Sequence, residues 1–291
     1  MRKGRNEIRR VLFVALALLT ATGAFAQSQG TQQQQPTQGQ DAGQPKPGAP
    51  QAAPLTLDSA PPPVSAEEDA AIKAFRDVPV SEMEKKEQAG EDFVKKYPKS
   101  RYDAEVYSWL VKGYLNTGQV DKMEAAGDKE LGLVPDDAQT LAIIGSTLPR
   151  AMNANTPDPE KRLAKAEQYC QKALDLMPAL VKPANVSDED FQKAKNQAAA
   201  LAYSGLGLVA FRRGKFADAI PHFEQSVKVD PSPDPVNYYL LGICQQKTSH
   251  FDDAVAAFTK CAAIPGGLQA TCKNNIDEAK KLAATQLSAP K

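Results

Sequence analysis

The chain has 291 residues, enough for one large domain or two ordinary ones, and 42% of them are hydrophobic, which is sufficient for a packed core. Its 35 basic residues balance its 35 acidic residues. Because five of the basic residues and only one acid lie in residues 1–26, the rest of the chain is slightly acidic and does not favour nucleic acid as a partner.

Residues 1–26 have the order of a secretory signal peptide. Basic residues come first, an apolar run begins at Val11, and small residues around Ala26 precede Gln27. This order predicts cleavage between Ala26 and Gln27 and export to the periplasm or the exterior. The apolar run is shorter than the roughly 20 residues of a spanning helix, so a retained membrane anchor is the weaker alternative. We expect no stable membrane span after removal of the signal.

Residues 27–64 consist mainly of Gln, Pro, Gly and Ala, with almost no charge and few large apolar side chains. Such a segment cannot bury enough apolar surface to offset the conformational entropy lost on folding. We therefore predict a disordered linker over 27–64, followed by a helical repeat domain over 65–286.

Helical hairpins are predicted from Ser65 onward. Ser65 is followed by acidic residues, which is typical of a helix start, and it begins a weak helix pair over 65–99. Clearer units follow over 104–137 and over 138–180. In the second of these, Pro149 should end or kink the first helix, and a proline-containing insertion separates that helix from its partner.

The strongest signal is an internal repeat near the C-terminal end. Ser187 and the acids after it begin a long helix that ends near Arg213 and supplies the first helix of a unit over 200–233. The landmarks of that unit return 35 residues later, over 235–268. They are Tyr203, Leu206, Gly207, Phe216, Ala219, Phe223 and Ser226, followed by Tyr238, Leu241, Gly242, Phe251, Ala254, Phe258 and Cys261. An amphipathic helix over 268–286 is expected to cover the last apolar face.

A period in the mid-thirties is typical of stacked helix pairs. Two antiparallel helices pack closely where one of them presents a small side chain, and Gly207, Gly242, Ala219 and Ala254 supply that close approach. The aromatic and leucine landmarks fill the volume around it. These residues resemble the tetratricopeptide repeat family, in which an aromatic residue, a Leu-Gly pair, an alanine, a second aromatic and a closing proline recur over about 34 residues.

The resemblance implies an all-α fold, a right-handed α-solenoid of helical hairpins with a C-terminal capping helix. It extends over residues 65–284, and its motifs are most specific over 200–266. The unit that begins at 104 departs from the family pattern at Val111, where a small residue is usual, and at Gly127, where an aromatic residue is usual.

The same resemblance implies a concave groove lined by the first helix of each hairpin. Candidate groove residues are Ser204, Leu208, Phe211 and Arg212 in one unit, and Tyr239, Ile243, Gln246 and Lys247 in the next. Apolar anchors flanked by cations suit an extended or helical peptide with some acidic character. The alternative is that the apolar members pack against neighbouring helices, because buried apolar positions outnumber ligand contacts.

The chain contains four cysteines, and export would permit disulfides. Four cysteines allow three complete pairings, which sequence alone does not separate. Cys261 and Cys272 are the preferred pair, because they lie near the end of one predicted helix and near the start of the next. Cys170 and Cys244 are interpreted as small buried thiols, and buried free thiols remain the alternative for all four.

No catalytic, cofactor-binding or metal site is predicted. His222 and His250 are 28 residues apart and have no neighbour at metal-ligand spacing. The sequence also contains no Gly-rich phosphate loop, nucleophile elbow or HExxH motif. Each histidine is therefore interpreted as a surface residue.

The expected function is a non-enzymatic protein-protein interaction scaffold of the bacterial cell envelope, which binds a partner peptide or protein in the concave groove. Residues 93–100 also resemble repeats of exported bacterial envelope proteins, including outer-membrane assembly and Tol-Pal partners. The alternative is a structural or assembly component of the envelope, with residues 27–64 as a spacer. The sequence leaves the partner's identity and the oligomeric state open.

Overall fold

The computed structural model describes residues 65–288, with side chains as far as residue 285. Within that range it contains eleven α-helices, one short 3-10 turn and no strand, so the all-α prediction is confirmed. The predicted signal peptide and linker lie outside the described residues.

The helices follow one another with short connections. Their bounds are α2 Ala66–Asp77, α3 Met83–Lys96, α4 Asp103–Asn116, α5 Val120–Leu133, α6 Ala138–Ala151, α7 Pro159–Leu176, α8 Asp188–Arg212, α9 Phe216–Val229, α10 Pro235–Lys247, α11 Phe251–Ala263 and α12 Gln269–Ser288. Each helix packs mainly on the helices next to it in the chain, and α6 also packs along α8.

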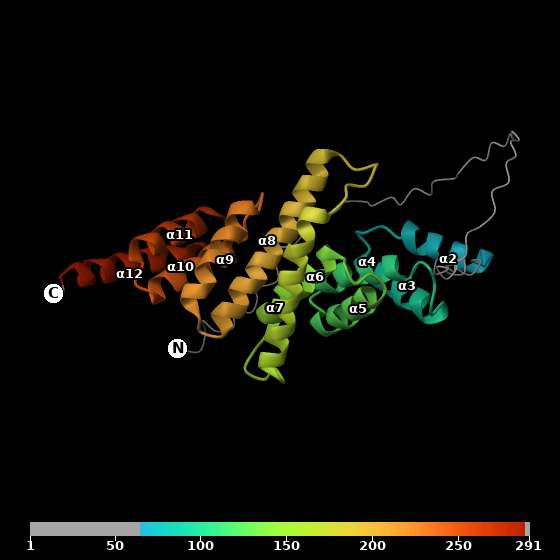
Figure 1. Ribbon diagram of the computed structural model, residues 1–291, viewed down its shortest axis with the longest axis horizontal. Helices are drawn as coiled ribbons and strands as arrows, with labels where there is room; N and C mark the ends of the chain where they lie inside the picture. The colour runs from blue at the N-terminus through green and yellow to red at the C-terminus, as the bar shows by residue number, and fades with distance from the viewer. Residues whose placement is uncertain (1–64, 289–291) are drawn as a thin grey trace, which may run out of the picture.

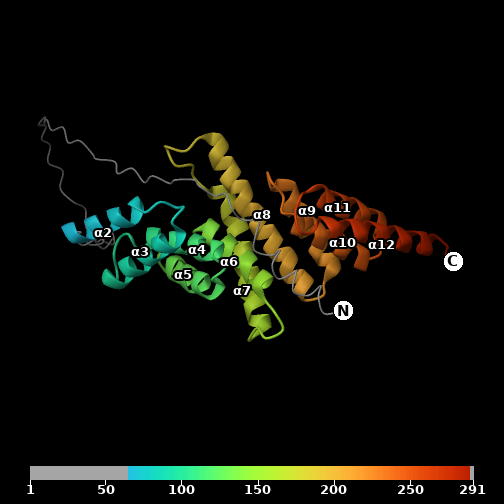
Figure 2. The same ribbon diagram turned by 180° about the vertical axis from the view of Figure 1, so that it is seen from behind.

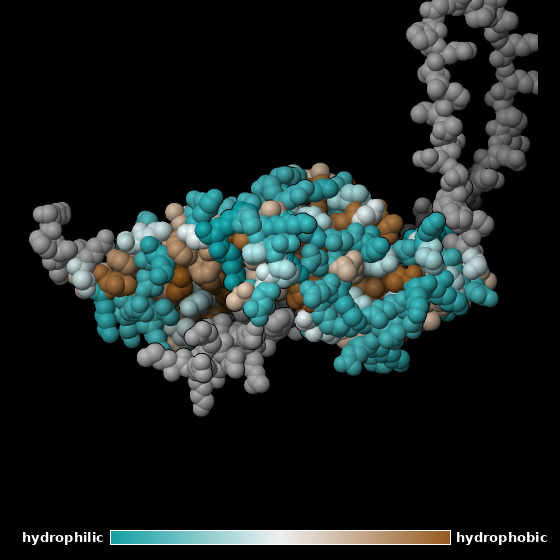
Figure 3. All heavy atoms as spheres, turned by 90° about the horizontal axis from the view of Figure 1, so that it is seen from below, coloured by the Kyte–Doolittle hydropathy of each residue, from teal (hydrophilic) through white to brown (hydrophobic). Residues whose placement is uncertain are grey.

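The hairpins form an elongated stack, with α2 and α3 at one end and α12 at the other (Figure 1). The long helices α7 and α8 cross the middle of the stack, and the view from behind shows the same order (Figure 2). This is the α-solenoid that the repeat predicts. Figure 3 shows a face on which polar side chains cover most of the described surface, and apolar side chains gather in smaller patches between them.

Two predicted helix starts are confirmed by their hydrogen bonds. The Ser65 hydroxyl accepts from the backbone N–H of Glu68 at 3.1 Å, and the Ser187 hydroxyl accepts from that of Asp190 at 3.0 Å. Each bond satisfies a donor that has no partner within its helix. The resulting long α8 runs to Arg212, one residue short of its predicted end.

The glycine landmarks allow the helices of a hairpin to approach closely. A Cβ atom added to Gly207 would lie 2.8 Å from the ring of Phe223, and one added to Gly242 would lie 2.7 Å from the ring of Phe258. Such distances are too short for an unshifted packing contact. The glycines therefore make room for the buried aromatic rings, and the fully buried Ala219 and Ala254 lie one helical turn earlier.

The unit that begins at 104 packs in spite of its departures from the family pattern. Val111 is fully buried, and the space beside Gly127 is filled by the side chain of Ile144 from the next hairpin. An aliphatic side chain from α6 thus replaces the missing aromatic ring of α5.

Candidate functional site

The predicted groove residues lie on the C-terminal half of α8 and along α10. Ser204 and Leu208 are only 1% and 5% exposed. Their placement corrects the expectation that they line an open groove, because neither side chain has a surface to offer to a peptide in this structure. The reason in each case is a neighbouring hairpin that covers the position.

Ser204 belongs to a buried hydrogen-bond network at the junction between two hairpins. Its hydroxyl donates to Oδ1 of Asn237 at 2.7 Å, and Nδ2 of Asn237 donates to the Ser226 hydroxyl at 3.0 Å. Ser226 in turn donates to the backbone carbonyl of Ala200 at 2.9 Å. The network joins α8, α9 and α10 and satisfies buried polar groups that would otherwise destabilise the fold.

Leu208 packs in the hydrophobic core of the same hairpins. Its cluster includes Phe223 from α9 and Leu241 and Cys244 from α10. The alternative interpretation, in which apolar groove candidates pack against neighbouring helices, therefore holds for Leu208.

Arg212 binds the end of α6. Its guanidinium donates to the backbone carbonyls of Pro149 and Met152, each at 3.0 Å. Burial lowers the pKa of Arg212. These bonds satisfy carbonyls that lack a helical partner. The guanidinium of Arg212 thereby links α8 to the end of α6. The helix α6 ends at Ala151, shortly after Pro149, which agrees with the prediction that Pro149 ends or kinks it.

The aromatic candidates are half-buried. The ring of Phe211 packs edge-on against Phe216 at a centroid distance of 5.6 Å, and the ring of Tyr239 lies 6.1 Å from that of Phe258. Ile243 packs on the cluster that contains Phe258. Burial raises the pKa of Tyr239. Each of these three side chains contributes to the core and keeps part of its surface exposed.

The last two candidates end α10. Gln246 is half-buried and Lys247 is exposed. The structure assigns no ion pair to Lys247 among residues 65–285. The groove candidates that keep exposed surface are therefore Phe211, Tyr239, Ile243, Gln246 and Lys247.

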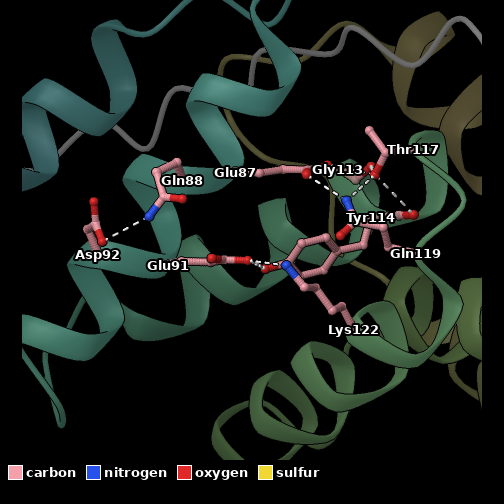
Figure 4. Close-up of polar contacts among 9 residues, drawn as sticks. All are labelled: Glu87, Gln88, Glu91, Asp92, Gly113, Tyr114, Thr117, Gln119 and Lys122. Carbon is pink, nitrogen blue, oxygen red and sulfur yellow. Dashed lines mark hydrogen bonds and ion pairs between the residues drawn. The ribbon is translucent and has the colours of Figure 1, made fainter.

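A polar network connects the earlier hairpins (Figure 4). Glu87 of α3 accepts from the Thr117 hydroxyl at 2.8 Å and from Nε2 of Gln119 at 2.9 Å. One turn later, Glu91 accepts from the hydroxyl of Tyr114 and from Lys122 at 2.8 Å, and the Lys122 bond lowers the pKa of Glu91. These groups satisfy one another, which assigns them to the packing of α3 on α4 and α5.

Ion pairs also link α5 to α7. Glu124 binds Arg162 at 2.6 Å and Lys165 at 2.9 Å. Burial alone would raise the pKa of Glu124, but the hydrogen bonds from the two cations outweigh it and lower the pKa. Glu130, farther along α5, is 1% exposed, and no ion pair joins it to another of residues 65–285. Burial, with the nearby charge of Asp137, raises its pKa to about 8.

The two histidines lie in separate surroundings. His222 is half-buried, and burial lowers its pKa. His250 is exposed, and its Nδ1 lies 2.9 Å from the Thr248 hydroxyl. The part of the chain that the structure describes contains no group of three or more potential metal ligands. It also contains no helix that is both long and apolar enough to cross a membrane.

The structure joins Cys261 at the end of α11 to Cys272 at the start of α12 by a disulfide, with a Cα–Cα distance of 6.0 Å. Cys170 and Cys244 are free and buried. The thiol of Cys170 lies against both Gly145 and Gly205, where an added Cβ would meet it. Burial raises the pKa of Cys244 to about 12.

The family model of the tetratricopeptide repeat matches residues 200–233. Residues 200–233 are thus a tetratricopeptide repeat, as the resemblance of their landmarks indicates. No curated protein sequence matches the chain.

Three solved structures illustrate its similarity to known proteins. A thermophilic tetratricopeptide-repeat protein of Thermus thermophilus is 16% identical with a TM-score of 0.46, over 74% of this chain and 99% of that one. PilW, a type IV pilus biogenesis factor, is 16% identical with a TM-score of 0.49, over 76% and 93%. PilF of Pseudomonas aeruginosa is 17% identical with a TM-score of 0.49, over 75% and 87%.

Proposed function

We propose that this chain is a non-enzymatic scaffold of the bacterial cell envelope, which binds a partner protein or peptide on the accessible groove face of α8 and α10. The observation that carries the proposal is the set of partly exposed apolar side chains, Phe211, Tyr239 and Ile243, on helices of a tetratricopeptide-repeat fold. Proteins of this fold bind protein partners on extended surfaces.

The chemistry of the face selects the kind of partner. Aromatic edges that are already held by core packing lose little conformational entropy on binding and supply contact area. Lys247 adds an exposed cation at the end of the face. A peptide with apolar side chains and an acidic residue beside them complements this arrangement.

The envelope location rests on the sequence of residues 1–26, with its basic start, its apolar run and its small residues before Gln27. Residues 27–64 would then connect the repeat domain to the start of the exported chain.

Affinity purification of the full chain, followed by mass spectrometry, identifies the partner. Binding of that partner is then compared between Lys247→Glu and Lys228→Glu, since both lysines are exposed and lie near the ends of their helices. We expect weaker capture only with Lys247→Glu, and unchanged helical circular dichroism in both. Equal capture by the two variants would contradict this face as the binding site.

The structural alternative predicts a different fractionation. A structural or assembly component would sediment persistently with the envelope, whereas the proposed scaffold would appear as a free form in the periplasmic fraction.

A further inference from the structure

A shallow hollow of about 200 Å³ lies between α10 and α11, apart from the face proposed above. Its lining comes from Tyr238, Leu241 and Gln245 on α10 and from Asp253, Ala257 and Lys260 on α11. Cofactor and drug-sized ligands occupy pockets of about 300–1,000 Å³, so this hollow has the size for one side chain of a partner.

The hollow faces a different side of α10 from the groove face. Tyr238 and Gln245 are seven residues apart and therefore share one face of the helix, as do Tyr239 and Gln246. Successive helical residues differ by about 100° in direction, so the two pairs point to different sides. The hollow can consequently bind a ligand that does not touch Tyr239.

The two ends of the hollow differ in charge. Because α10 and α11 form an antiparallel hairpin, Gln245 and Asp253 lie together next to the turn, where the backbone N–H of His250 donates to the Gln245 carbonyl at 2.8 Å. Tyr238 and Lys260 lie together at the opposite end. One end thus presents hydrogen-bond acceptors and the other presents a cation.

At the end of the hollow that presents acceptors, the side-chain oxygen of Gln245 lacks a hydrogen-bond donor. The residue is only 6% exposed, and its side-chain oxygen Oε1 is buried without a hydrogen-bond partner. A buried acceptor left unpaired costs about 1–3 kcal/mol, which a ligand with an N–H donor would recover. Asp253 beside it is exposed, and the structure assigns it no ion pair within residues 65–285.

We propose that this hollow binds an arginine side chain of a partner protein, which goes beyond the groove contacts of the proposed function. The guanidinium has several N–H donors in a planar fork and no acceptor, so it satisfies Oε1 of Gln245 and the carboxylate of Asp253 together. Its methylene stem packs on Leu241 and Ala257. Lys260 repels a cation from the opposite end, which directs the guanidinium toward Asp253.

The test is a titration of the isotope-labelled full chain with N-acetyl-arginine amide, followed by two-dimensional NMR. N-acetyl-citrulline amide, which is neutral and of the same shape, is the control ligand. We expect saturable shifts of the Gln245 side-chain amide and of the Asp253 and Ala257 backbone amides with arginine alone. Asp253→Asn should weaken arginine binding about two- to fivefold, the range for a partly exposed ion pair.

Asp252→Asn is the matched variant, because Asp252 is the exposed neighbour in the same first turn of α11 but does not line the hollow. Equal effects of the two asparagine variants, equal shifts with citrulline, or no saturable shift at these residues would each overturn the proposal. Lys247→Glu should leave arginine binding unchanged. Loss of the groove face and loss of the arginine site are thereby distinguished.

Discussion

Replacement of the Cys261–Cys272 disulfide by a hydrogen bond should preserve the fold of α12 at a lower local stability. The repeat itself suggests the replacement. Ser226 and Asn237, which are joined by a buried hydrogen bond, lie 11 residues apart, as do the two cysteines. Ser226 returns as Cys261 and Asn237 returns as Cys272, each 35 residues later. The disulfide therefore occupies the hairpin junction that a hydrogen bond occupies one unit earlier.

The expected magnitudes follow from the two kinds of link. Closing a loop of this length by a disulfide contributes about 3 kcal/mol in the chain-entropy description. A buried hydrogen bond contributes about 1 kcal/mol. In the double variant Cys261→Ser with Cys272→Asn, the free energy needed to detach α12 should thus be about 2 kcal/mol lower than in the oxidised protein. The double alanine variant should lose about 1 kcal/mol more than that.

Hydrogen exchange at the amides of α12 measures this local stability, because stacked repeats can open in parts. A difference of about 3 kcal/mol corresponds to roughly hundredfold faster exchange in the double alanine variant. Reductant should accelerate exchange only in the native chain. Alkylation should modify Cys261 and Cys272 only after reduction, which a mass shift detects.

Two results would refute this reasoning. One is unchanged α12 exchange in the native chain after reduction and alkylation. The other is equal exchange in the Ser/Asn and the Ala/Ala variants, since the hydrogen bond would then contribute nothing at the junction.

Three further perturbations test the packing and the charges. Gly207→Ala should lower the free energy of unfolding in urea by about 1–3 kcal/mol, because the added Cβ would collide with the Phe223 ring. Gly132→Ala is the control: its added Cβ has nothing within 4 Å, so this variant should be neutral or stabilising. In the folded state the pKa of the Glu130 carboxyl is raised from 4.5 to about 8. Between these two pH values only the unfolded chain releases the proton, so the free energy of unfolding should fall as the pH rises from about 4.5 to about 8. Glu130→Gln should remove that fall. Glu124→Gln should lower stability by about 0.5–1 kcal/mol at low salt and by less at high salt, and an equal loss at both would argue against an ionic origin.

The helix boundaries and the hairpin order could be predicted from the sequence because they depend on local or repeated signals. Ser65 and Ser187 begin helices through hydrogen bonds to residues three positions ahead. The return of Gly207 as Gly242, each opposite a buried phenylalanine, indicates which helices pair. Such signals act within one hairpin, so the rest of the chain does not alter them.

The exposure of each groove candidate was decided only by the tertiary structure. Ser204 and Leu208 occupy positions that the repeat pattern assigns to a groove, yet α10 covers Leu208 and bonds Ser204 through Asn237. The sequence predicts that Arg212 is a cation of the groove, but its guanidinium donates to backbone carbonyls that lie about sixty residues earlier in the chain. The unpaired oxygen of Gln245 likewise depends on how α11 lies beside α10. Burial and hydrogen bonding between hairpins are set by contacts distant in the sequence, and therefore no periodicity within one repeat can specify them.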